Sequence, residues 1–212
     1  MHCTRILAIR HGETAWNKDT RIQGQLDIPL NDTGLWQAQR TAEALRGEAV
    51  SAVYASDLQR AAQTAQAIGA ALALPVQHHP GLRERHFGDC QGATWAELET
   101  LRPEVAEPWR RRVPDFAPPG GESLLTLRER VAQTFAELAA QHLGEQIVVV
   151  AHGGVLDILY RLTTRLDLQA PRTWLLGNAA INRVLWTPEG LTLVGWADTA
   201  HLADSTRDEL TS

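Results

Sequence analysis

The sequence predicts an α/β fold: a three-layer sandwich with a mainly parallel central sheet flanked by helices, and a small insertion over the core. Short, continuous apolar runs at 6–9, 52–54 and 147–151 are typical of buried strands. Each run is followed by a segment whose apolar residues recur at helical spacing. Strands that alternate with helices pair in parallel, because the helix carries the chain back across the sheet.

The first two helices are predicted to follow the first two strands. Residues 31–34 form a turn that launches a helix through Leu45, and Gly47 is its expected stop. Residues 56–59 have the form of a capping box, which predicts that an Ala-rich helix begins there. A third, brief strand is expected at 75–77.

The middle of the chain is less regular, and we interpret residues 81–121 as an insertion that lies over the core. The insertion contains two short helical segments, and prolines interrupt it. The helical segments are 95–98 and 105–107, and the interruptions are Pro114, Pro118 and Pro119.

Regular patterns return in the last third of the chain. A long helix is predicted at 122–142, and another from Gly153 to Leu162 after the strand at 147–151. Residues 182–186 and 191–196 flank a turn and predict a hairpin. The polar tail, residues 198–212, is expected to be loosely held.

Length and composition predict one domain spanning residues 1–212, since no linker or internal repeat divides the chain. The net charge of −5 argues against a nucleic-acid partner, so an anion would need a local cluster of cations. Cys3 and Cys90 give neither a disulfide framework nor a metal spacing. We find no signal peptide and no apolar run long enough for a bilayer, so we expect a cytoplasmic protein without a membrane partner.

Potential chemistry collects at the ends of two predicted strands. One strand runs into Arg10 and His11, and the strand at 147–151 runs into His152. Ligands of open α/β sheets bind at the carboxyl ends of strands, so the two histidines meet if these strands are neighbours. Gly12 and Gly153 let the backbone approach a ligand closely, and the helix after His152 should aim free N–H groups at an anion.

Arg60 adds a second guanidinium to this candidate anion site. Its position in the first turn of a helix costs about 0.3–1 kcal/mol through the macrodipole, which is tolerated if the side chain reaches an anion. Arg10 and Arg60 could hold phosphate oxygens through paired N–H groups. Both cations would keep His11 neutral, as a nucleophile requires. Glu84, set among cations in a loop, is the best candidate for a general acid if it carries or shares a proton.

Several other polar residues are expected to be structural or solvated. Arg110–Arg112 is typical of a solvated helix face. The adjacent residues His78 and His79 would diverge on a strand, so no zinc site is expected. The histidines expected to have no catalytic role are His2, His78, His79, His142 and His201.

Residues 7–17 resemble the signature of the histidine phosphatase superfamily, which includes the cofactor-dependent phosphoglycerate mutases. The resemblance continues in order along the chain and extends to about Trp196. The further matching segments are 23–24, 29–31, 56–65, 82–84, 120–123 and 149–154.

The resemblance implies a role for each candidate residue. His11 would be phosphorylated, and Glu84 would protonate the leaving oxygen and later activate water. The phosphoryl group would be bound by Arg10, Arg60, His152, Asn17 and the backbone N–H of Gly153, with Gln23 and Gly24 at the edge of the pocket. The resemblance implies no metal and no cofactor, because positioning and fixed positive charge carry phosphoryl transfer.

The implied activity is that of a phosphomonoesterase that acts through a phosphohistidine on a small phosphorylated metabolite. Mutases of the family carry a tyrosine where this chain has Phe87 and a lysine where it has Trp95, and their insertion is longer. A mutase is the alternative, because residues 84–88 and 91–92 resemble the corresponding sequence of the mutases more than that of the phosphatases.

A third hypothesis is a catalytically dead protein that binds a phosphorylated ligand, although retention of the catalytic set argues against it. The residues that set substrate choice are expected in the insertion, where Trp95, Trp109 and Arg110–Arg112 mix aromatic and cationic groups. The oligomeric state is open, and an exposed edge strand would allow a homodimer.

Overall fold

The computed structural model describes residues 2–203, and these form an α/β structure around a six-stranded sheet. The strand order is β3-β2-β4-β1-β5-β6. The first four of these pair in parallel, and β5 and β6 add an antiparallel hairpin beside β1. The strands are β1 (Thr4–Arg10), β2 (Ala52–Ala55), β3 (Val76–His78), β4 (Gln146–Ala151), β5 (Ile181–Thr187) and β6 (Gly190–Asp198).

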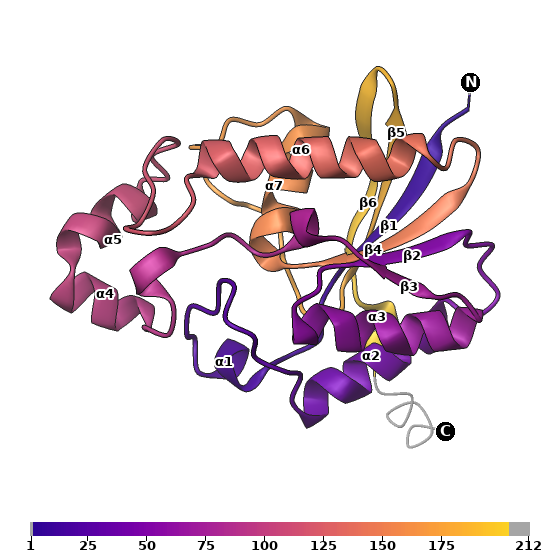
Figure 1. Ribbon diagram of the computed structural model, residues 1–212, viewed down its shortest axis with the longest axis horizontal. Helices are drawn as coiled ribbons and strands as arrows, with labels where there is room; N and C mark the ends of the chain where they lie inside the picture. The colour runs from indigo at the N-terminus through magenta and orange to yellow at the C-terminus, as the bar shows by residue number, and fades with distance from the viewer. Residues whose placement is uncertain (1, 204–212) are drawn as a thin grey trace, which may run out of the picture.

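Helices cover both faces of the sheet, so the predicted three-layer sandwich is confirmed (Figure 1). The helices α6 (Leu124–Ala140) and α7 (Gly153–Thr164) lie on one face. The helices α2 (Asp32–Ala44) and α3 (Gln59–Leu72) lie on the other. The four-residue helix α1 (Ala15–Lys18) lies near the ends of the parallel strands.

The two-residue period of the strands divides the core into two layers. Ile147 and Val149 of β4 face α6 and α7, whereas Val148 and Val150 face α2 and α3. All four side chains are fully buried. A strand with apolar residues on both faces must be central, which is why the continuous run at 147–151 correctly predicted a buried parallel strand.

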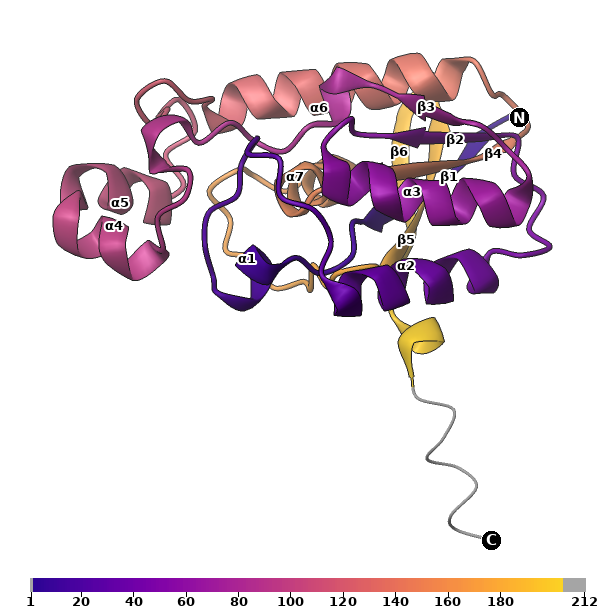
Figure 2. The ribbon, with the colours of Figure 1, turned by 60° about the horizontal axis from the view of Figure 1, so that its bottom comes forward.

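The insertion projects from one end of the sandwich (Figure 2). It carries α4 (Trp95–Leu101) and α5 (Pro103–Arg110), which pack around a small apolar cluster of their own. Leu98, Val105 and Ala106 are the buried members from these two helices. Both short helices agree with the sequence expectation.

Two local expectations need correction. Helix α3 begins at Gln59 rather than Ser56, and Leu58 is its N-cap, without a side-chain cap. The Ser56 hydroxyl instead accepts from the Leu58 N–H. The start of the tail is also held: in the short 3₁₀ helix Ala200–Leu202, the ring of His201 contacts the Thr41 hydroxyl and the Ala179 carbonyl. The rest of the predicted tail, 204–212, lies outside the described residues.

None of the helices within residues 2–203 is both long and apolar enough to cross a membrane.

Candidate active site

The two strand-end histidines lie side by side, as the sequence predicted for neighbouring strands. Strands β1 and β4 pair in a register that places Arg10 opposite Ala151. The backbone N–H of His11 donates to the Ala151 carbonyl at 3.0 Å. The ring centroids of His11 and His152 are therefore only 5.1 Å apart.

His11 presents an unprotonated ring nitrogen to the pocket. Its Nδ1 lies 2.7 Å from the Gly12 carbonyl oxygen, which can only accept, so Nδ1 carries the proton. The lone pair is then on Nε2. Burial lowers the pKa of His11 well below 6.5, and the charges of Arg60 and Arg10 lower it further. The arginines lower the pKa as the sequence predicts, and burial, which the sequence does not show, is the larger cause.

His152 is a second buried neutral imidazole. Burial lowers its pKa well below 6.5, and Arg60 is the next largest cause. Its side chain is fully buried, and neither ring nitrogen has a hydrogen-bond partner among residues 2–203. A buried ring without hydrogen-bond partners costs free energy of folding unless a ligand supplies the partner. His152 can therefore donate to an oxygen that is bound beside His11.

The two predicted arginines both reach the site and are partly held by backbone carbonyls. Arg10 donates through Nη1 to the Leu176 carbonyl. Arg60 donates to the carbonyls of Leu26 at 2.8 Å and Gly24 at 2.6 Å. The Nε groups of Arg10 and Arg60 are buried without partners among the described residues. Burial lowers the pKa of Arg60 to about 10, so the guanidinium stays charged at neutral pH.

Glu84 lies at the N-terminus of α7, where the sequence predicted that free backbone N–H groups would face a bound anion. Its Oε2 accepts from the Gly154 N–H at 3.0 Å, and its Oε1 accepts from the Arg85 N–H at 2.8 Å. The helix end that we expected to offer its N–H groups to an anion therefore uses one of them to hold this carboxylate. A Cβ at Gly154 would collide with Glu84 Oε1, so glycine is the residue that leaves this carboxylate in place.

Asn17 is oriented by a residue that the sequence did not single out. Its Oδ1 accepts from the Thr14 N–H and from Asn178 Nδ2, at 3.1 and 3.3 Å. The amide oxygen is thereby occupied, and the NH₂ group is left free to donate. Asn178 also donates to the His11 carbonyl at 3.0 Å. No local signal could identify Asn178, because 161 positions separate it from Asn17.

These side chains enclose a phosphate-sized pocket of about 150 Å³. The predicted residues His152 and Gly153 are not among its lining residues, although the His152 ring is tilted by 56° against that of His11. Gly24 has a positive φ of 52°, and its carbonyl accepts from Arg60. Arg21 and Phe87 also line the pocket, although we did not predict either as a site residue. The predicted residues among its lining are Arg10, His11, Asn17, Gln23, Gly24, Arg60 and Glu84.

A larger cavity of about 440 Å³, here called the outer cavity, shares Arg10 and Phe87 with the phosphate pocket. Gly153 and Gly154 line it where it meets α7. Its other lining residues are Arg85, Trp109, Arg112, Leu124, Leu127, Asp157, Arg172, Trp174, Leu175 and Leu176.

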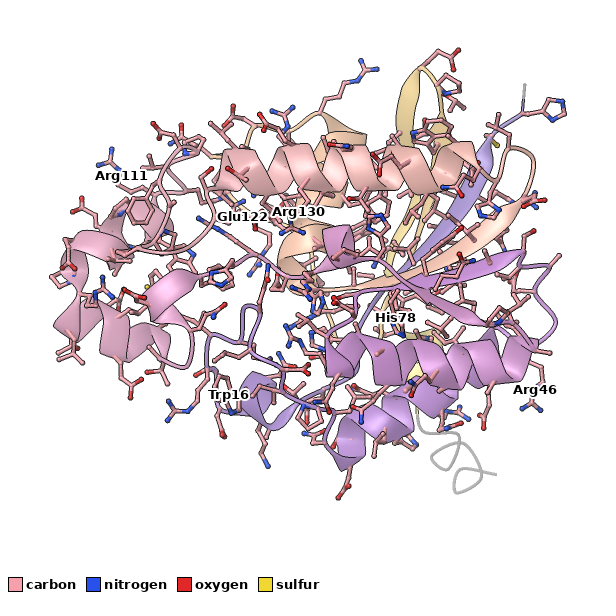
Figure 3. The ribbon with its side chains drawn as sticks, in the orientation of Figure 1. Trp16, Arg46, His78, Arg111, Glu122 and Arg130 are labelled. Carbon is pink, nitrogen blue, oxygen red and sulfur yellow. The ribbon has the colours of Figure 1, made fainter. Side chains whose placement is uncertain are left out.

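The insertion contributes to the outer cavity only in part as predicted. Trp109 and Arg112 line it, whereas Trp95 packs in the apolar cluster of the insertion. The expectation that Arg112 is solvated is wrong. Its guanidinium pairs with Asp157 Oδ2 at 2.7 Å. Arg111 points to solvent at the outer surface of the insertion (Figure 3). The segment 172–176, which also lines the cavity, carries no motif that the sequence could have shown.

A partly buried ion pair fixes the loop that carries Glu84. Arg130 of α6 donates to both oxygens of Glu122, at 2.9 and 2.7 Å (Figure 3). The same guanidinium donates to the carbonyls of Gly81 and Arg83.

Within residues 2–203, no group of three His, Cys, Asp or Glu side chains is placed to hold a metal ion.

The chain is similar in sequence to a known family of phosphatases. The family model described as "Histidine phosphatase superfamily (branch 1)" matches residues 6–199. The chain is 42% identical to phosphoglycerate mutase-like protein 4 of Arabidopsis thaliana, over 94% of this chain and 87% of that protein. It is 40% identical to a metal-independent phosphoserine phosphatase of the same plant, over 94% and 84% of the two chains.

A solved structure shows the same fold. A mycobacterial glucosyl-3-phosphoglycerate phosphatase superimposes with a TM-score of 0.83 at 33% identity, over 93% of this chain and all of that one.

Proposed function

The chain belongs to the histidine phosphatase superfamily, and from that membership we propose how its site hydrolyses a phosphate ester. The protein is a phosphomonoesterase for a small phosphorylated metabolite, a class to which two of the relatives above also belong by name. The observation that carries the residue assignment is the buried His11 ring, whose proton is on Nδ1 and whose Nε2 faces a pocket lined by three arginines.

In the first step, His11 Nε2 attacks phosphorus, and the bond from phosphorus to the ester oxygen breaks. The electron pair of that bond goes to the leaving oxygen, which takes the proton of a protonated Glu84 carboxyl and leaves Glu84 as a carboxylate. Arg10, Arg60 and His152 stabilise the negative charge on the non-bridging oxygens, and the free NH₂ of Asn17 and the Gly153 N–H supply further donors.

In the second step, water attacks the phosphohistidine. Glu84 takes the proton of the water, the bond from phosphorus to Nε2 breaks, and the pair returns to the imidazole. The products are inorganic phosphate and the free enzyme, with His11 neutral and Glu84 protonated again. The chemistry uses positioning and fixed charge, and none of its steps requires a metal.

A phosphoglycerate mutase is the second candidate, because one relative is named a phosphoglycerate mutase-like protein. A mutase would return the phosphoryl group from His11 to a second hydroxyl before water intervenes. Phe87 and Trp95, which replace the tyrosine and lysine expected of mutases, argue against it, and Trp95 lies outside both cavities.

The deciding experiment follows the phosphoryl group. The enzyme should release inorganic phosphate from 4-nitrophenyl phosphate, and rapid quench with labelled ester should trap label on His11. The His11→Asn variant should lose both signals. Interconversion of 2- and 3-phosphoglycerate, stimulated by a bisphosphate primer, would instead establish the mutase. Binding of phosphate without label on His11 would indicate a catalytically dead protein.

We also propose a cytoplasmic setting, which the two free cysteines support. A homodimer through the edge strand β6, where Val194 is exposed, is the assembly to test by light scattering.

A further inference from the structure

The outer cavity is larger than a three-carbon leaving group needs. At roughly 30 Å³ for each water molecule, 440 Å³ corresponds to about fifteen waters. The alcohol released from phosphoserine or phosphoglycerate has only about seven non-hydrogen atoms, so it would leave about half of this space to solvent. The volume lies in the range typical of pockets that hold whole drug-sized molecules.

Flat and aliphatic side chains are among those that line the outer cavity. The rings of Phe87 and Trp109 are stacked, with centroids 4.7 Å apart and planes at 13°. Leu124 and Leu127 of α6 lie among the lining residues as well. These groups can stack on and enclose a ring, whereas a short polar chain would gain little from them.

The outer cavity also has an excess of positive charge. Its one carboxylate, Asp157, is already shared, since Oδ2 accepts from Arg112 at 2.7 Å and from Arg161 at 3.0 Å. Arg85 donates to the carbonyls of Glu122 and Phe116, and forms no ion pair among the described residues. Arg172 is exposed at the cavity and has no hydrogen bond or ion pair within residues 2–203.

Unpaired guanidiniums attract a negative charge on the part of the ligand that lies outside the phosphate pocket. A guanidinium binds a carboxylate through two parallel N–H groups, and Arg172 is free to do so. Arg85 is 4% exposed and sits 5.5 and 5.7 Å from the Phe87 and Trp109 ring centroids, so it adds charge behind the aromatic wall.

We propose that the outer cavity selects phosphate esters whose alcohol carries both a ring and a carboxylate. The ring lies against Trp109, and the carboxylate is bound at Arg172. This inference rests on the proposed hydrolysis at His11 and adds the class of leaving group to it. It distinguishes the enzyme from a phosphatase dedicated to three-carbon acids.

Three primary alkyl phosphates with similar leaving oxygens test the proposal. They are 4-carboxybenzyl phosphate (ring and acid), benzyl phosphate (ring only) and the phosphate ester of 3-hydroxypropionate (acid only). The first should have a kcat/KM about fivefold above either of the others, since one exposed charge pair or one stacked ring is worth about that factor. In Arg172→Gln, the ratio of 4-carboxybenzyl to benzyl phosphate should fall about fivefold, as expected for an exposed pair.

Arg46→Gln is the matched control. Arg46 is also exposed, but it lies at the far end of the molecule from the insertion (Figure 3), and its loss should leave the substrate ratio within about twofold. Equal kcat/KM for the three esters, or a ratio unchanged in Arg172→Gln, would overturn the proposal while hydrolysis of 4-nitrophenyl phosphate still stood. Loss of that hydrolysis together with absence of label on His11 would reject the proposed function itself.

Discussion

Replacing Gly154 by alanine should disable proton transfer without unfolding the protein. A Cβ at this position would collide with Glu84 Oε1 and come within 3.2 Å of its carboxyl carbon. The carboxylate is the flexible end of a side chain, so it can move aside. Gly154 is in the first turn of α7 and has no positive φ, so alanine fits the backbone there.

The expected size follows from what the collision displaces. Glu84 loses its 3.0 Å hydrogen bond from the Gly154 N–H and moves away from the leaving oxygen. General acid catalysis contributes about 10²–10⁴-fold, and a misplacement of about 1 Å costs on the order of 10²-fold. We therefore expect kcat/KM for an alkyl phosphate to fall at least about 100-fold. The melting temperature should change little, because alanine is the better helix former.

The assay compares an alkyl phosphate with 4-nitrophenyl phosphate, whose leaving oxygen needs little protonation. Gly154→Ala should lose much less activity on the nitrophenyl ester. Gly195→Ala is the control, because a Cβ there would meet nothing within 4 Å and Gly195 lies in β6, outside both cavities. If Gly154→Ala impaired both esters equally, or retained full activity on the alkyl ester, Glu84 would not be the proton donor held by this helix end.

Three other perturbations have defined outcomes. Glu84→Gln should lower turnover of alkyl phosphates by roughly 10²–10⁴-fold and spare aryl phosphates, as steady-state kinetics would show; adding Gly154→Ala to it should cost little more, because both act on one group. Asn178→Ala should raise KM several-fold by releasing the Asn17 amide, and an unchanged KM would show that Thr14 suffices to orient it. Thermal melts of the free protein should show stability falling as the pH drops below about 6.5, because the lowered pKa values of His11 and His152 leave only the unfolded chain able to bind those protons. His152→Asn should flatten that slope by up to about 1.4 kcal/mol per pH unit, and an unaltered slope would refute the burial argument.

The fold and the proximity of the two strand-end histidines could be predicted because their signals are local. The central strands β1 and β4 are continuous apolar runs, and each ends in a histidine followed by glycine. A parallel sheet brings such strand ends to one edge, so the proximity of His11 and His152 followed from topology. The start of α3 was misplaced because Ser56 and Gln59 match a capping box in spacing, while the Ser56 hydroxyl bonds the Leu58 N–H instead.

The contacts that could not be predicted join residues far apart in the chain. The Gly154 N–H meets a carboxylate 70 positions away, and Arg112 meets one 45 positions away. Arginine runs are usually solvated, and only the position of α7 in space brings Asp157 to Arg112. The segment 172–176 forms part of the outer cavity by the path of its backbone, and its composition gives no sign of that role.

Burial and the arginines have different effects on the protonation of the His11 ring, which must stay neutral in the proposed mechanism. In the free enzyme, burial is the larger cause of its lowered pKa, so the ring is neutral before any ligand arrives. A bound phosphate dianion would favour a proton on the nearest imidazole and so block the attack. Arg10 and Arg60 oppose this effect, because they line the same pocket as His11 and their positive charges offset the negative charge of the phosphate. They therefore keep the pKa of His11 low in the complex. Removing Arg60 should therefore impair the phosphate complex more than the free enzyme, and the loss of activity should be larger at lower pH.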